Sequence, residues 1–182
     1  MKLSRERKYA KAAEVFQEAV RIDPQFYSAH EDLGDALYRL GRYDESISSS
    51  RQATAISSNF KPYYNMGLAY IAQKDWSGAN YAFERAITHC NQANWEEHYS
   101  HAHYYLGLSM AWLGEAETAI RDLEKSLEIS PEMPYGRFEL ATLYLGSGKH
   151  KEAMAQYRIL KDLNPMLANE LLKLIKKYRK SA

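Results

Sequence analysis

Three histidines lie close together near the middle of the chain, at His98, His101 and His103, and His89 and Cys90 precede them. Imidazole and thiolate groups are ligands that Zn²⁺ prefers in proteins. On one helix, however, His98 and His103 lie about 140° apart, so they cannot share a metal with His101 without distortion. We therefore expect a surface or core role for these histidines and predict no metal site.

Other signals for chemistry are absent from the sequence. It contains no glycine-rich phosphate loop, no nucleophile elbow and no zinc-protease motif. Cys90 has no base beside it except His89, which as its sequence neighbour points to another side of a helix. A buried structural thiol is the expected role of Cys90. The sequence thus predicts no catalytic residue, no cofactor and no enzyme activity.

The composition limits the kinds of partner. The 182 residues carry 24 Lys and Arg against 23 Asp and Glu, and this balance argues against nucleic acid as the main partner. No apolar run approaches the roughly 20 residues that span a bilayer. A single cysteine excludes an internal disulfide, so a reducing, cytoplasmic compartment is expected. With 15 Tyr but only 9 Gly and 5 Pro, helices joined by short turns are favoured over sheet.

An internal repeat organises the chain. A large apolar residue followed by a small one recurs at Leu33-Gly34, Met66-Gly67, Leu106-Gly107 and Leu140-Ala141. The small members are 33, 40 and 34 residues apart, and another small residue follows each of them twelve positions later. These second small residues are Ser46, Ala79, Ala119 and Ala153. The pattern predicts a repeated helical hairpin, because small residues let two helix backbones approach closely.

Short turns separate the two helices of a pair. Gly41, Gly114 and Gly148 occupy these turns, where glycine supplies the left-handed residue that commonly ends a helix. Over about 160 residues the pattern resembles the tetratricopeptide repeat. The resemblance implies an all-α fold, an α-α superhelix (solenoid) of stacked antiparallel helical hairpins, whose first helices line the concave side. We expect one array, divided into a partial repeat at 1–26, repeats at 27–59, 60–92, 93–133 and 134–165, and a capping helix at 166–182.

Some segments depart from the regular pattern. The 40-residue interval predicts a long first helix from about Trp95 to Leu113, with Asn94 as its N-terminal cap and Glu97 in capping-box position. Ser46 and Ser50 predict looser packing in the first full repeat. At the N-terminus the first helix is expected to be missing or to be only a stub at 2–7. A truncated capping repeat and a cut from a longer protein both explain this, and the cut is favoured.

The exposed arc of the first helices defines a predicted peptide-binding groove. Positions −6, −3, −2, +1, +4 and +5 from each small landmark share one side of the helix. The candidate residues are Glu31, Asp35, Tyr38, Tyr64, Asn65, Leu68, His101, Tyr104, Tyr105, Leu108, Trp112, Tyr135 and Phe138. One end of this arc is acidic and the rest is aromatic and aliphatic, which is typical of an interaction surface. Packing of Tyr104, Trp112 and Phe138 between repeats is the alternative.

The arc predicts a partner segment with apolar anchors and a basic flank that faces Glu31, Asp32 and Asp35. Well-known peptide readers of this family clamp a C-terminal carboxylate with Lys, Arg and Asn. In the equivalent places here only Asn65 matches, and two carboxylates would repel such a ligand. The chain is therefore not expected to be an adaptor for chaperone tails.

Protein binding is the predicted function: a non-enzymatic scaffold or adaptor that holds a peptide or helical segment of a partner. A targeting or regulatory module of a larger enzyme or of a secretion or assembly protein is the main alternative. Self-association through the open N-terminal repeat is another. The basic tail from Lys173 to Lys180 suits a solvated helix end as well as it suits an acidic partner.

Overall fold

The computed structural model describes residues 2–90 and 92–181, and the side chains of residues 6–90 and 97–178. Over these residues it contains ten α-helices and no strand, so the predicted all-α class is confirmed. The helices fall into two compact units, residues 1–91 and 92–182. The prediction of one array along the whole chain, with the repeat boundaries given above, stays a prediction.

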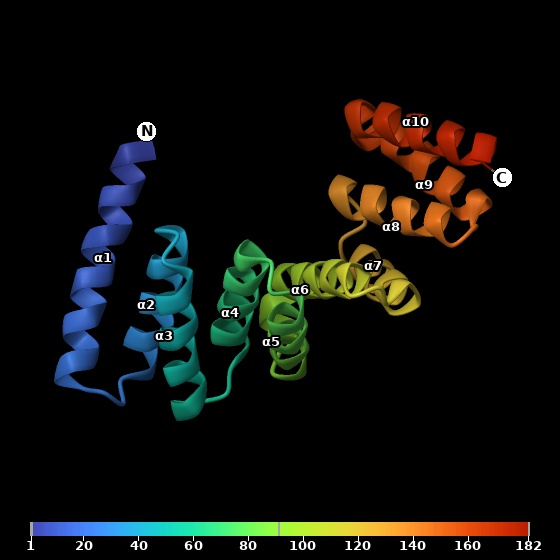
Figure 1. Ribbon diagram of the computed structural model, residues 1–182. Helices are drawn as coiled ribbons and strands as arrows, with labels where there is room; N and C mark the ends of the chain where they lie inside the picture. The colour runs from blue at the N-terminus through green and yellow to red at the C-terminus, as the bar shows by residue number, and fades with distance from the viewer. Residues whose placement is uncertain (1, 91, 182) are drawn as a thin grey trace. The chain divides into compact units, whose positions relative to one another are not determined.

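The first unit, unit 1, holds five helices (Figure 1). They are α1 (Lys2–Ile22), α2 (Tyr27–Arg39), α3 (Tyr43–Ile56), α4 (Phe60–Gln73) and α5 (Trp76–Thr88). Two hairpins pair α2 with α3 and α4 with α5, while α1 packs on α2 and α3 packs on α4. The segment expected as a separate stub at 2–7 instead belongs to α1, which is one continuous helix.

The second unit, unit 2, holds the other five helices (Figure 1). They are α6 (Gln92–Trp112), α7 (Ala116–Ile129), α8 (Pro134–Gly146), α9 (His150–Leu163) and α10 (Pro165–Ser181). Two hairpins pair α6 with α7 and α8 with α9, and α10 packs on α9 and α8. The long helix predicted here is confirmed at 21 residues, but it begins at Gln92. Asn94 therefore lies inside α6 instead of capping it, and its side chain is outside the described residues.

Small residues set the close approach of paired helices, as predicted. A Cβ atom on Gly107 would lie 2.9 Å from Leu123 Cγ and 3.0 Å from the carbonyl oxygen of Ala119. A Cβ on Gly67 would lie 2.7 Å from the ring of Phe83. Both contacts are too short for a side chain, so glycine is required where α4 meets α5 and where α6 meets α7.

The hairpin turns use the left-handed backbone conformation. Gly41, Gly114 and Gly148 have φ of 75°, 88° and 72°, which confirms the role predicted for them. In the remaining hairpin, between α4 and α5, this place is taken by Lys74 with φ of 60°. A non-glycine residue tolerates this conformation at a cost of about 1 kcal/mol.

Each unit has its own apolar core. In unit 1, Ala13 of α1 packs with Leu33, Ala36 and Leu37 of α2. In unit 2 the core joins α7, α8 and α9 to Leu171 and Ile175 of α10. Because these two residues are fully buried while Lys173, Lys176 and Lys177 are exposed, the predicted amphipathic capping helix is confirmed.

The serines of α3 are buried. Ser46 Oγ donates a hydrogen bond of 2.7 Å to the carbonyl oxygen of Gly34. Ser50 Oγ has no hydrogen-bond partner among the described residues, although the side chain is fully inaccessible to solvent. Serine thus fills the close contact between α2 and α3 at the cost of one unsatisfied hydroxyl.

Candidate peptide-binding surfaces

The candidate residues of unit 1 lie on its two first helices. Glu31, Asp35 and Tyr38 belong to α2, and Tyr64, Asn65 and Leu68 belong to α4. These two helices contact each other directly. We refer to these six residues with Asp32 and Lys61 as the unit 1 surface.

The acidic residues of the unit 1 surface already have a cation. Lys61 Nζ donates to Glu31 Oε1 at 2.7 Å and to Asp32 Oδ1 at 3.1 Å. The Tyr27 hydroxyl donates to the other oxygen of Glu31 at 2.5 Å. Burial alone would lower the pKa of Lys61, but its bonds to the two carboxylates outweigh burial and raise it. The expectation that Glu31 and Asp32 face a basic flank of a partner stays a prediction, and Lys61 already offsets part of their charge.

Asp35 is the remaining acid predicted there. It accepts a hydrogen bond of 3.3 Å from Nε of Arg39, one turn further along α2. Both side chains reach solvent, so this pair contributes at most about 0.5 kcal/mol. The Asp35 carboxylate is therefore still accessible to a partner.

Asn65 and Tyr64 are less accessible than the helical arc predicts. Asn65 is only 4% exposed, and its Nδ2 has no hydrogen-bond partner among the described residues. Its prediction as an open groove residue is wrong on this count. Tyr64 is half-buried, stacked on Phe60 at 5.3 Å between centroids and edge-on to Phe83 at 5.7 Å. The Tyr64 ring is therefore partly packed against other aromatic rings of unit 1.

The candidate residues of unit 2 also lie on its first helices. On α6 they are His101, Tyr104, Tyr105, Leu108 and Trp112, and on α8 they are Tyr135 and Phe138. The two helices contact each other. We call these seven residues and Glu139 the unit 2 surface.

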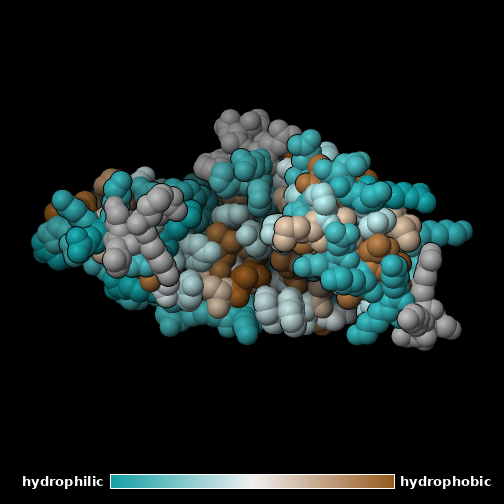
Figure 2. Space-filling view, turned by 90° about the horizontal axis from the view of Figure 1, so that it is seen from above, coloured by the Kyte–Doolittle hydropathy of each residue, from teal (hydrophilic) through white to brown (hydrophobic). Residues whose placement is uncertain are grey.

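Aromatic side chains of the unit 2 surface reach solvent. Trp112 is 68% exposed and Tyr135 is 62% exposed. Tyr104, Tyr105 and Phe138 are half-buried, and Tyr104 and Phe138 pack against the unit 2 core. The packing alternative therefore holds in part for Tyr104 and Phe138, while Trp112 is largely exposed. On the face of the molecule shown in Figure 2, hydrophobic side chains are visible among hydrophilic ones.

Titratable groups of α6 and α8 influence each other on this surface. Burial raises the pKa of Tyr104, and the charges of Glu139, Tyr105 and Tyr135 raise it further. Burial also raises the pKa of Glu139. The Tyr104 and Tyr105 rings meet edge-on, with 5.1 Å between their centroids. Glu139 shares the arc of the candidate residues but was not among those predicted to bind.

His101 has an intramolecular partner on the same helix. Its Nδ1 lies 2.8 Å from the carbonyl oxygen of Glu97, so Nδ1 carries the proton and donates. The ring is half-buried, and Leu108, two turns further along α6, is half-buried too. His101 and Leu108 thus lie beside the aromatic side chains of the unit 2 surface.

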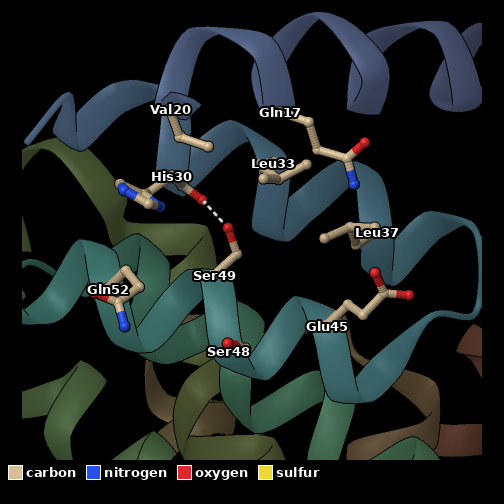
Figure 3. A pocket seen from close by; sticks show the side chains of 9 residues that line it. All are labelled: Gln17, Val20, His30, Leu33, Leu37, Glu45, Ser48, Ser49 and Gln52. Atoms are coloured by element: carbon tan, nitrogen blue, oxygen red, sulfur yellow. Dashed lines mark hydrogen bonds between the residues drawn. The ribbon is translucent and has the colours of Figure 1, made fainter. Parts of the chain in front are cut away.

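A pocket of about 230 Å³ opens in unit 1 between α1, α2 and α3 (Figure 3). Val20, Leu33 and Leu37 supply its apolar wall, and Gln17, Ser48 and Gln52 supply polar groups. Ser49 Oγ closes one side by donating to the carbonyl oxygen of His30 at 3.2 Å. This pocket was not predicted, because the arc of the first helices includes neither α1 nor α3. The run of small serines in α3 is the sequence feature that could have indicated it.

The described histidine, cysteine and acidic side chains form no site for chemistry that can be recognised from their positions. Among the described residues no group of three or more His, Cys, Asp and Glu side chains is placed to hold a metal ion. His103 Nδ1 lies 2.9 Å from Asp122 Oδ1, which links α6 to α7. Cys90 is half-buried, and burial raises the pKa of its thiol, so the nucleophilic thiolate is disfavoured. None of the described helices is both long and apolar enough to cross a bilayer.

Family models of the tetratricopeptide repeat match residues 3–59, and residues 63–89 with 101–132. These segments cover more than half of the chain and include residues of seven of its ten helices, all within the described part. The chain belongs to the tetratricopeptide repeat family. The resemblance seen in the spacing of the small residues is thereby confirmed.

Two curated relatives match over part of their length. The chain is 22% identical over 128 residues to the BBSome complex member BBS4 of Bos taurus, covering 70% of this chain and 24% of that protein. It is 31% identical over 83 residues to a probable UDP-N-acetylglucosamine–peptide N-acetylglucosaminyltransferase SPINDLY of Hordeum vulgare, covering 41% of this chain and 9% of that protein. The matched part of this chain thus spans a quarter or less of the length of each of these two relatives.

Solved structures share the fold over most of the chain. MamA superposes with a TM-score of 0.75 at 24% identity, covering 93% of this chain and 92% of that one. YrrB, described as a tetratricopeptide repeat protein with an unusual peptide-binding site, superposes with a TM-score of 0.78 at 18% identity. That match covers 92% of this chain and 85% of YrrB. The predicted fold class, a helical solenoid, is confirmed by these neighbours.

Proposed function

We propose that this chain is a non-enzymatic scaffold or adaptor that binds a peptide or helical segment of a partner protein on the faces of its first helices. The observation that carries the proposal is the exposure of Trp112 and Tyr135, two large aromatic side chains on neighbouring first helices of unit 2. Large exposed aromatic residues have an unfavourable contact with water that a partner relieves. Trp and Tyr are also enriched among the residues that dominate binding energy.

The half-buried neighbours support the same role. Tyr104 and Phe138 pack their inner sides on the core, so their outer sides are held at fixed positions. A rigid aromatic side chain loses little conformational entropy when a partner binds, which favours affinity. YrrB, whose printed description names a peptide-binding site, shares the fold and supports a peptide ligand for this chain.

The unit 1 surface contributes contact area more than charge. Lys61 pairs with both Glu31 and Asp32, while Tyr38 and Leu68 remain half-exposed. We therefore assign apolar and hydrogen-bonding contacts to α2 and α4. The absence of catalysis is part of the proposal, and the raised pKa of the Cys90 thiol supports it.

Binding of display-selected peptides tests the proposed function. Random peptides are selected on the immobilised chain, and their affinities are measured by fluorescence anisotropy for the wild type and for Trp112→Ala and Tyr135→Ala. We expect each substitution to weaken binding about tenfold or more, the loss typical of an aromatic hot spot. Because both side chains are largely exposed, the fold tolerates their removal.

Tyr81→Ala is the matched control, since Tyr81 is 55% exposed but lies on α5, a second helix. This variant should keep the wild-type affinity. Equal affinity of all four proteins, or a failure to select any peptide, would reject the proposed surface.

A second candidate role is that of a targeting or regulatory module within a larger enzyme or assembly protein. The curated relatives favour it, because they are much longer than this chain and one of them is named as a glycosyltransferase. An immunoblot of the endogenous protein tests it: a band near the mass expected for 182 residues would contradict this role, and a much larger band would support it.

A further inference from the structure

Glu139 differs from the other acidic residues of the protein. Five acidic side chains are half-buried in the part of the chain that the structure describes: Glu31, Asp32, Asp35, Asp122 and Glu139. Lys61 pairs with the first two, Arg39 with Asp35, and His103 contacts Asp122. Within the described residues Glu139 has neither a hydrogen bond nor an ion pair. A half-buried carboxylate without a partner is unfavourable in the free protein.

Two tyrosines, one on α8 and one on α6, lie in the neighbourhood of this carboxylate. Tyr135 lies one turn before Glu139 on α8, so the two side chains occupy the same side of that helix. Tyr104 of α6 is close enough for the charge of Glu139 to raise its pKa. The site therefore combines one unpaired negative charge with a largely exposed ring and a fixed, half-buried ring.

This combination suits a long cationic side chain. The faces of tyrosine rings attract ammonium and guanidinium groups, and the methylene stems of Lys and Arg pack on aromatic surface. A carboxylate at the same place supplies the counter-charge and forms charge-assisted hydrogen bonds with the cation. A neutral or acidic side chain would leave Glu139 unpaired beneath the ligand, which opposes its binding.

We propose that Tyr104, Tyr135 and Glu139 form a subsite of unit 2 that binds a lysine or arginine side chain of the partner segment. The subsite rests on the proposed function and adds to it the position at which a basic residue is selected. It also moves the basic residue of the partner from the unit 1 surface, where Lys61 already occupies the acids, to α6 and α8. The raised pKa of Glu139 agrees with a carboxylate that lacks a partner in the free protein.

A double-mutant cycle tests the subsite. The probes are the peptides selected on the full chain, each made also with its basic residues replaced one at a time by norleucine, and with Lys exchanged for Arg. Affinities are measured for the wild type and Glu139→Gln. We expect one basic position at which norleucine weakens binding to the wild type about tenfold, while binding to Glu139→Gln changes less than about twofold. The Lys and Arg forms of the peptide show which cation is preferred.

Glu170→Gln is the matched control, because Glu170 is an exposed acid of unit 2 on α10. This variant should reproduce the wild-type response to norleucine. Circular dichroism of each variant verifies that it is folded.

The outcomes separate this inference from the proposed function. If selected peptides bind and depend on Trp112 and Tyr135, but no basic position couples to Glu139, the subsite is overturned and the scaffold function stands. If no peptide binds, the scaffold function and the subsite are both rejected. Equal coupling in Glu139→Gln and Glu170→Gln would show nonspecific charge attraction and would also overturn the subsite.

Discussion

At the scale of single residues, the unpaired carboxylate of Glu139 connects stability with binding. Its charge is partly removed from water, and no described side chain compensates it. Burial favours the protonated form, so the folded state binds a proton at Glu139 more tightly than the unfolded state does. The free energy of unfolding therefore decreases as pH rises from the ordinary glutamate pKa of about 4.5 to the raised pKa in the folded protein.

Glu139→Gln should remove this pH-dependent loss of stability. The variant and the wild type should have similar free energies of unfolding at a pH below the ordinary pKa, where Glu139 is protonated in both states. As pH rises through the window above it, the variant should become the more stable protein, and the difference should level off above the raised pKa. Urea denaturation at a series of pH values measures the difference. Glu170→Gln should show no such trend, and parallel stability curves for Glu139→Gln and the wild type would contradict the prediction.

At the scale of helices, side-chain contacts between first and second helices supplement the apolar packing. His103 of α6 and Asp122 of α7 meet at 2.9 Å, and neither side chain is more than 16% exposed. Tyr99, one turn before His103, contacts the imidazole edge-on at 4.8 Å between centroids. His103 Nε2 has no hydrogen-bond partner among the described residues, so Asp122 is the ring's main polar contact.

Asp122→Ala should therefore destabilise the α6–α7 hairpin. It leaves a largely buried imidazole without a partner, and we expect a loss of about 1–3 kcal/mol in the free energy of unfolding. Urea denaturation with the denaturant dependence held common to both proteins measures it. Asp162→Ala, at an exposed acid of α9, should cost less than about 0.5 kcal/mol. Equal losses for the two variants would show that the His103–Asp122 contact contributes nothing.

The helical hairpins were predictable from sequence where the backbone requires glycine. Gly107 marks a close helix contact and Gly114 marks a left-handed turn, and the structure has both. The turn at Lys74 gives no such signal, since lysine seldom adopts positive φ. The start of α6 was also missed, because Asn94 resembles a cap although the helix already begins at Gln92.

The candidate surfaces were less predictable. Helical spacing shows on which side of a helix a side chain lies, but it does not show what covers that side chain in the folded protein. Trp112 and Tyr135 are as exposed as their positions indicate. Asn65 lies on the same arc but is covered. The partner of Glu31 lies 30 residues away in sequence, at Lys61, so no local pattern reveals that the acid is neutralised. Charge pairing between neighbouring first helices has to be seen in three dimensions.

At the scale of the whole molecule, contacts are mainly between neighbouring helices. Every strong helix–helix contact of the described residues joins consecutive helices or helices two apart in the chain. Repeat proteins with this property are stabilised by each repeat and its adjacent interfaces. A local loss of packing is therefore expected to remain local.

Leu171→Ala tests this locality. Leu171 of α10 is fully buried in the unit 2 core, and its truncation should cost about 2–5 kcal/mol. Hydrogen exchange followed by mass spectrometry should show faster exchange in α8, α9 and α10, and unchanged exchange in α2 and α3. Leu163→Ala, at a partly exposed residue ending α9, should have a much smaller effect. Faster exchange throughout both units would indicate a single cooperative structure instead.

The bridge from Lys61 to Glu31 and Asp32 has one more consequence. The single ammonium charge of Lys61 offsets only one of the two carboxylate charges beside it, so this cluster keeps a net negative charge. Acetylation of Lys61 would abolish that ammonium charge and double the net negative charge of the cluster. The strength of the negative charge on this face thus depends on the modification state of one lysine.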